Sequence, residues 1–153
     1  MTPTTAAPAA PALDRYAPAP PAHLLDIDAV TGVHAAATRN IPGTLPFFAT
    51  HFPRQPILPG VMLLGTAEEV AALACPPTAG GWRLRSAVRA RWKHPVLPGD
   101  QVRVRAEVTG ADDDALQFKV AITVKDQLVA DIGKLILVPR APFTAAVHPE
   151  EDR

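Results

Sequence analysis

The chain has 153 residues, of which 48% are hydrophobic and 20% are charged, a composition ordinary for one globular domain with a real core. Its formal net charge is zero, so no overall charge draws it to nucleic acid or to a membrane surface. No apolar run approaches the roughly 18 residues that span a bilayer, and the N-terminus lacks a secretory signal, so we expect a cytoplasmic protein.

The two ends of the chain differ from its middle. Residues 1–21 are mostly Ala, Pro and Thr without a periodic apolar pattern. Such a segment cannot bury enough apolar surface to offset the entropy lost on ordering, which predicts a disordered arm. Residues 141–153 are predicted to form a loose tail, which leaves residues 22–140 as the single domain.

The first predicted elements are a hairpin and one helix. Residues 24–29 and 33–40 flank Thr31-Gly32 and predict two strands joined by a turn. Residues 61–74 are apolar and rich in alanine, and Pro76-Pro77 stops a helix there.

Four runs of alternating residues follow the helix: residues 82–93, 101–109, 117–125 and 127–138. Gly99-Asp100, the acidic cluster 111–114 and Asp126-Gln127 separate them as turns. One helix followed by a meander of strands predicts an α+β fold, with a curved antiparallel sheet wrapped on the helix. Unpaired edge strands in so small a sheet favour dimerisation.

One of these runs carries a cationic stripe: Arg83, Arg85, Arg89, Arg91 and Lys93. Arg103 and Arg105 continue it on the next predicted strand. The stripe is either a docking surface for an acidic partner or an ordinary solvated face. It lacks interleaved exposed aromatic residues and any recognised binding module, so nucleic-acid binding is not expected.

The loop before the helix is the most informative stretch. His51 opens it, and three prolines (Pro53, Pro56 and Pro59) restrict its conformations before folding. Gly60 stands where the helix begins, with a free N–H at the positive end of the helix dipole. A histidine base beside a polarised backbone amide suits proton transfer next to a carbonyl.

Other chemistries find little support. Cys75 is the only cysteine, so neither an intrachain disulfide nor a multi-cysteine metal site can form. Ser86 is the only serine and has no nucleophile elbow around it. The other histidines lack zinc-ligand spacing, and no phosphate-binding or dinucleotide motif is present, so no metal and no cofactor are expected.

Residues 46–53 (PFFATHFP) and 56–61 (PILPGV) resemble the signature of the β-hydroxyacyl-acyl-carrier-protein dehydratases of fatty-acid synthesis, the FabZ/FabA type. Residues 23–28 (HLLDID) are similar to the first strand of that family, and residues 94–101 (HPVLPGDQ) to its second turn. The resemblance covers about residues 21–138. It implies a hotdog fold, in which two protomers pair to build shared active sites.

The resemblance also implies roles. His51 would take a proton from C2 of a (3R)-3-hydroxyacyl thioester, and the N–H of Gly60 would hold the thioester carbonyl. The predicted substrate-binding residues are Phe52, Pro59, Val61, Leu64 and Gly65, with core packing the competing role for Leu64. His51 could instead bond a loop carbonyl, and Gly60 could serve backbone freedom alone. The substrate would arrive on an acyl carrier protein, which is acidic and could dock on the cationic stripe.

The acid of the family is missing from its place. The family has Glu or Asp fourteen residues beyond the histidine, where this chain has Gly65. That acid protonates the departing hydroxyl, an effect worth about 10²–10⁴ in rate. Glu69 could lean back over the vacant position, because helical side chains tilt toward the N-terminus. A related partner could supply the acid instead, or Glu68 and Glu69 could be a solvated or interface pair.

We therefore expect a hydro-lyase that forms trans-2-enoyl thioesters in fatty-acid, polyketide or polyene assembly, as a homodimer or as one half of a heterodimer. A non-catalytic scaffold subunit is the first alternative, which Gly65 favours. A hotdog thioesterase or double-bond isomerase is the second, because proton transfer by His51 could suffice there.

Overall fold

The computed structural model describes residues 25–50 and 54–142. The predicted arm at residues 1–21 and most of the predicted tail lie outside the described residues, as do His51 and Phe52. The boundaries predicted for the domain, residues 22 and 140, therefore remain predictions.

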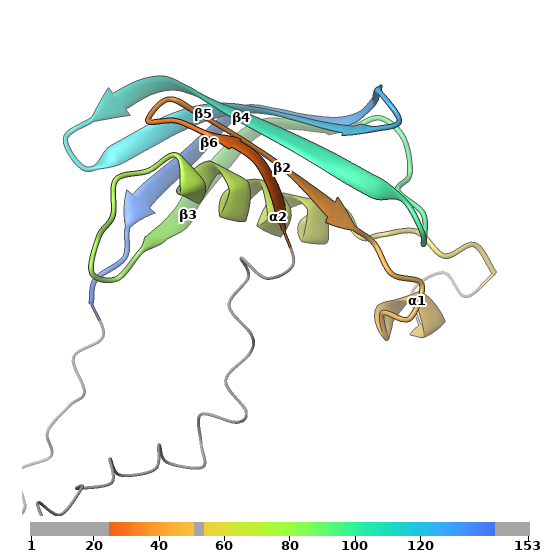
Figure 1. Ribbon diagram of the computed structural model, residues 1–153. Helices are drawn as coiled ribbons and strands as arrows, with labels where there is room; N and C mark the ends of the chain where they lie inside the picture. Colours follow the sequence, from red (N-terminus) through yellow and green to blue (C-terminus); the bar gives the residue numbers. More distant parts are fainter. Residues whose placement is uncertain (1–24, 51–53, 143–153) are drawn as a thin grey trace, which may run out of the picture.

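Six strands form one antiparallel sheet (Figure 1). They are β1 (Asp26–Val30), β2 (His34–Asn40), β3 (Trp82–Trp92), β4 (Gln101–Asp112), β5 (Ala115–Val124) and β6 (Gln127–Pro139). Their order across the sheet is β1-β2-β4-β5-β6-β3. Strand β3 thus crosses over to pair with β6 and forms one edge of the sheet, while β1 forms the other.

Helix α2 (Gly60–Leu73) lies against the inner face of this curved sheet (Figure 1). Its buried residues follow the spacing of one helical face: Leu63, Thr66, Ala67, Val70 and Ala71. The apolar residues of this set belong to one core with inward side chains of the strands, among them Phe118, Ile122 and Leu135. The predicted α+β hotdog architecture is confirmed. Within the described residues, no helix has the length and apolarity needed to cross a membrane.

The ends of several elements differ from the prediction. The acidic cluster was expected to form a turn over residues 111–114, but Asp112 pairs with Ala115, so the turn narrows to residues 113 and 114. A short helix α1 (Phe47–Thr50), which the sequence pattern does not predict, precedes the histidine loop and buries Phe48.

The edge strand β3 is irregular. Its pairing with β6 shifts by one residue between Leu84 and Ser86. Arg89 has a φ of 56°, and its side chain crosses Gly133 of β6, where an added Cβ would lie 2.9 Å from the Arg89 Nε. The simple alternation predicted for residues 82–93 is therefore interrupted, although all five cations of the stripe are exposed.

Candidate active site

The start of helix α2 is fixed by the connection between β3 and β4. The backbone N–H of Leu58 donates to the carbonyl of Val96 at 2.8 Å, so the end of the proline loop runs beside residues 94–96. Leu58 is buried, and one residue later Pro59 takes the N-cap position. The predicted helix start at Gly60 is confirmed.

Among the described residues, no side chain caps this helix start. Pro59 has no side-chain acceptor to offer, and no side-chain hydrogen bond to the cap is present in that part of the chain. The first N–H groups of a helix have no acceptor within the helix and stand at the positive end of its dipole. The N–H of Gly60 is thus suited to receive a carbonyl oxygen that gains negative charge.

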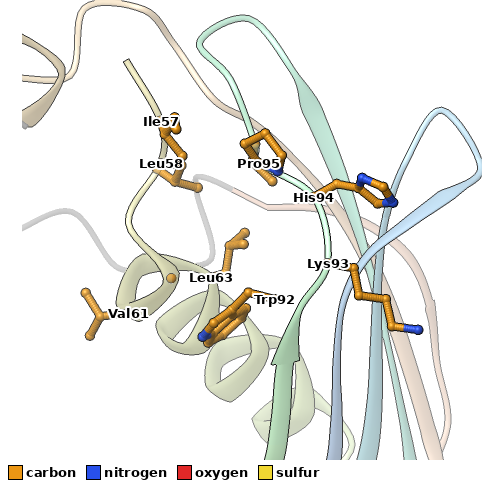
Figure 2. A pocket seen from close by; sticks show the side chains of 10 residues that line it. Ile57, Leu58, Val61, Leu63, Trp92, Lys93, His94 and Pro95 are labelled. Carbon is orange, nitrogen blue, oxygen red and sulfur yellow. The ribbon is translucent and has the colours of Figure 1, made fainter. Parts of the chain in front are cut away.

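A cavity of about 510 Å³ opens at this position. Its wall combines the first turn of α2 with the end of β3: Ile57, Leu58, Gly60, Val61, Leu63, Trp92 and residues 93–96. In Figure 2 the Trp92 indole lies beside the first turn of α2, whereas the Lys93 and His94 side chains point away from it. The mostly apolar wall near the helix suits an acyl chain.

Gly60 is explained by contact rather than by backbone freedom. Its φ lies outside the left-handed region, since Gly81 and Gly99 are the only described glycines with positive φ. A Cβ built on Gly60 would lie 3.0 Å from Cε2 and 3.2 Å from Nε1 of Trp92. A residue with a side chain would displace either the ring or the helix start.

The outward face of α2 is open at Gly65, where the sequence resemblance places an acid. Val61 is 69% exposed, and a Cβ built on Gly65 meets no atom of the described residues within 4 Å. Space for a larger side chain is therefore present at this position. Leu64 is half-buried and packs against the core, in line with the competing role stated for it above.

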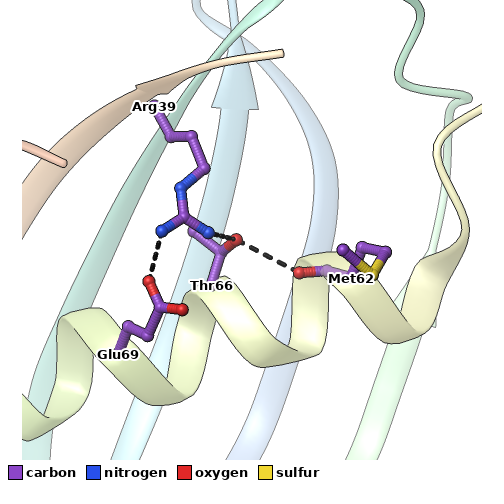
Figure 3. A network of polar contacts seen from close by, with 4 residues as sticks. All are labelled: Arg39, Met62, Thr66 and Glu69. Atoms are coloured by element: carbon purple, nitrogen blue, oxygen red, sulfur yellow. Dashed lines mark hydrogen bonds and ion pairs between the residues drawn. The ribbon is translucent and has the colours of Figure 1, made fainter. Parts of the chain in front are cut away.

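Glu69 is engaged elsewhere, as Figure 3 shows. Its carboxylate forms an ion pair with Arg39 of β2, with side-chain exposures of 29% and 16%. Nη1 of Arg39 also donates to Oγ1 of Thr66 at 2.8 Å, and the Thr66 hydroxyl donates to the Met62 carbonyl at 3.1 Å. Glu69 is thereby held toward β2 by a cation.

Sequence reasoning missed Arg39, although a signal was present. Along β2 the inward positions alternate, and Arg39 follows the buried Ala35 and Ala37 on the same face. A cation on an inward face requires an acidic partner, because a buried unpaired charge is costly.

Glu68 also bonds within the fold. Its Oε1 accepts the backbone N–H of Leu84 at 2.9 Å, next to the register shift of β3. Glu68 thus faces β3, whereas Glu69 faces β2.

A second cavity, of about 760 Å³, lies on the β2 flank of α2 beside Arg39 and Thr66. It is larger than the cavity at Gly60, and Leu58 is the one lining residue common to both. It does not reach the first helical residue or the open face at Gly65. We therefore assign the candidate active site to the smaller cavity, where the uncapped amide lies.

Two groups have a shifted pKa, the Cys75 thiol and the Asp131 carboxyl. Burial raises the pKa of the Cys75 thiol to about 11, which leaves very little reactive thiolate at neutral pH. Arg91 donates to Asp131 at 2.9 Å and Lys93 approaches it at 3.5 Å; the hydrogen bond from Arg91 is the main reason that the Asp131 pKa is lowered. Two cations of the stripe are thus partly neutralised. In residues 25–50 and 54–142, no three His, Cys, Asp or Glu side chains gather as metal ligands.

Comparison with known families gives a match over most of the domain. The model of the ApeI-like family, described as ApeI dehydratase, matches residues 29–132. The 3-hydroxyacyl-[acyl-carrier-protein] dehydratase FabZ of Sinorhizobium medicae is 35% identical over 109 residues, covering 67% of this chain and 71% of the relative. FabZ of Bordetella pertussis is 29% identical over 141 residues, covering 84% and 93%.

Solved structures share the fold at lower identity. The dehydratase heterocomplex ApeI:P from Xenorhabdus doucetiae aligns with a TM-score of 0.65 and 13% identity, covering 77% of this chain and 83% of that one. The PaaI protein of E. coli aligns with a TM-score of 0.62 and 17% identity, covering 80% and 84%. At such identities the likeness concerns the fold alone.

Proposed function

The chain belongs to the ApeI-like dehydratase family, and we propose that it removes water from 3-hydroxyacyl thioesters of an acyl carrier protein to give trans-2-enoyl thioesters. The reaction makes it a hydro-lyase, working in fatty-acid or polyketide assembly. The FabZ-named relatives support the substrate class. The observation that carries the proposal is that Gly60, the first residue of a helix without a described side-chain cap, lines a cavity of about 510 Å³.

The proposed chemistry begins at the thioester carbonyl. The Gly60 N–H donates to the carbonyl oxygen, which gains negative charge as a base removes the proton from C2. His51, nine residues earlier in the loop, is the proposed base. The electron pair of the broken C2–H bond then forms the C2–C3 double bond, and the C3–O bond breaks. The oxygen must gain a proton to leave as water.

We propose that a partner subunit donates this proton. Glu68 and Glu69 are both bonded within the fold, so neither is poised over the vacant position at Gly65. The open space at Gly65 could admit a partner's carboxylate. A homodimer would lack an acid at this position in both protomers, whereas a related protomer with the family's acid would complete one site. The fold neighbour ApeI:P is itself a dehydratase heterocomplex, which supports such pairing.

The edge of β3 is the proposed pairing surface. In the described part of the chain β3 pairs with β6 alone, and its Val88 and Trp92 side chains are nearly half exposed. An exposed strand edge with apolar side chains readily pairs with another chain. Pairing here would place the partner next to the cavity that Trp92 lines.

The test compares the chain alone with the chain mixed with related hotdog subunits encoded by neighbouring genes. Each preparation is incubated with a 3-hydroxyacyl carrier protein, and the intact mass of the carrier is followed. Loss of one water only in the mixture is expected. Full activity of the chain alone would contradict the partner's role. Hydrolysis of the thioester would indicate a thioesterase, and absorbance would detect an isomerase, whose reaction leaves the mass unchanged.

A scaffold subunit is the second candidate, favoured by the absence of an acid at Gly65. The two candidates differ in what His51 does. If a mixture contains one competent site, built from His51 and the partner's acid, then His51→Ala abolishes water loss. A scaffold would leave the activity of the mixture unchanged by that substitution.

A further inference from the structure

Trp92 reaches the helix start because of its place in the sheet. Arg91 pairs with Asp131 on the outer face of β6, so Trp92, opposite Ala130, faces the helix. The indole lies beside the first turn of α2 (Figure 2), with 48% of the residue still exposed. An aromatic ring left so exposed at the end of an edge strand contributes less to the core than its size allows.

The contact between Trp92 and Gly60 is close enough to constrain both residues. The ring atoms Cε2, Nε1 and Cδ2 lie 3.0, 3.2 and 3.3 Å from the point where a Cβ of Gly60 would be. Contacts of 3.0–3.4 Å are tighter than a methyl group accepts without movement of its neighbour. The indole therefore packs directly on the backbone of Gly60, which lines the cavity.

We propose that Trp92 is a positioning residue, which sets the place of the Gly60 amide relative to the acyl thioester and excludes any side chain at position 60. The inference rests on the proposed function for its catalytic part, because the amide matters only if it receives the carbonyl. Its structural part, the mutual constraint between positions 60 and 92, stands independently of the reaction. Displacing a reacting group by about 1 Å can cost on the order of 10²-fold in rate. Removing the Trp92 ring, which would let the Gly60 amide shift, is therefore expected to slow the chemical step.

The structural part is tested by a double-mutant cycle on thermal stability. In the wild-type background, Gly60→Ala forces a methyl group against the ring and is expected to lower Tm. In a Trp92→Ala background the methyl has room, and Ala is favoured over Gly in a helix, so the same change is expected to leave Tm unchanged or raise it. Equal changes in both backgrounds would overturn the proposal, whatever reaction the protein catalyses.

The catalytic part is tested on the active mixture. Trp92→Ala is expected to lower kcat by about 10²-fold with a smaller change in KM, and Trp92→Phe, which keeps a flat ring, to restore most of kcat. Trp82→Phe is the matched control, since Trp82 lies at the other end of β3 and donates to the Pro76 carbonyl at 2.7 Å, away from the cavity. An unchanged kcat in Trp92→Ala would overturn the proposal, as would a loss that Trp92→Phe does not restore.

Trp92 also supplies a binding signal that does not need turnover. With Trp82→Phe, Trp92 is the one tryptophan left in the chain. Its fluorescence is expected to change when an enoyl-pantetheine thioester is added to this variant in its active mixture with an unlabelled, tryptophan-free partner. If calorimetry detects binding of the probe while the fluorescence stays constant, Trp92 does not lie at the thioester site.

The failure of the proposed function can be told from the failure of this inference. If no mixture removes water but Gly60→Ala still changes Tm differently in the two backgrounds, the proposed reaction is rejected and the contact between Trp92 and Gly60 is retained.

Discussion

The flank of α2 that faces β2 and the outward face of the same helix differ in how their polar groups are satisfied. On the flank, Glu69 is held by Arg39, which also bonds Thr66. On the outward face, Gly65 borders open space. Residues four apart on a helix differ by about 40° in direction, and here that angle separates a structural ion pair from a vacant position. The Glu69 carboxylate therefore lies in a different environment from the position at Gly65.

The largest expected effect comes from filling the open face. Gly65→Glu is expected to raise the rate of water loss by the chain alone by about 10²–10⁴-fold, because it restores a positioned acid in a homodimer. The rate is measured on a 3-hydroxyacyl carrier protein by intact mass. Gly65→Gln is the matched control, with the same size and no acidic proton. Equal rates in the two variants would show that the acid was not what the chain lacked.

The second-largest effect is expected at the flank of α2 that faces β2, where Glu69 is paired with Arg39. Glu69→Gln leaves the mostly buried Arg39 charge without its counter-charge and is expected to lower the free energy of unfolding by about 1–3 kcal/mol, measured with urea. The activity of the mixture, at a temperature where the variant is folded, is expected to stay unchanged. Removing Arg39 as well, as Arg39→Gln/Glu69→Gln, should recover part of the loss. If Glu69→Gln abolished water loss in a folded protein, Glu69 would be the acid after all.

The smallest effect is expected at the exposed ion pair between Arg91 and Asp131. Its contribution to stability serves as a reference for that of the less exposed pair between Arg39 and Glu69. Asp131→Asn removes the partner of Arg91, whose side chain is 69% exposed, and should cost about 0.2–1 kcal/mol at pH 7. The Asp131 pKa is lowered in the folded state, so this stabilisation is present above the ordinary pKa of 3.8 and is lost as the pH falls through the lower folded value. Urea unfolding of both proteins from pH 7 downward should therefore show a difference that shrinks in acid. A difference that grows in acid would contradict the assignment.

The helices and strands could be predicted where apolar residues recur at one regular spacing along the sequence. Helix α2 follows its apolar spacing, and the strands follow their alternation. The turn after β4 was placed too early because acidic residues are typical of turns, whereas the pairing of Asp112 with Ala115 extends both strands. Helix α1 has only four residues, too few for any period to show.

The candidate site was predictable only in its local part. The helix start at Gly60 follows from the proline before it and the apolar run after it. The contacts of Arg39 with Glu69 and of Trp92 with Gly60 each join residues about thirty apart, and they depend on which strands flank the helix. Sheet order is a property of the whole fold, so no local pattern could have given these partners.

The irregularity of β3 has a consequence for the chain when it is made without the partner proposed above. A straight, uninterrupted edge would template any extended polypeptide and promote fibrils. The shift between Leu84 and Ser86 and the left-handed backbone at Arg89 divide this edge into short stretches, each with its own hydrogen-bonding phase. A partner strand can form hydrogen bonds along the whole of β3 only if its own irregularities lie opposite these two. The same two irregularities therefore make the β3 edge selective for the strand that pairs with it.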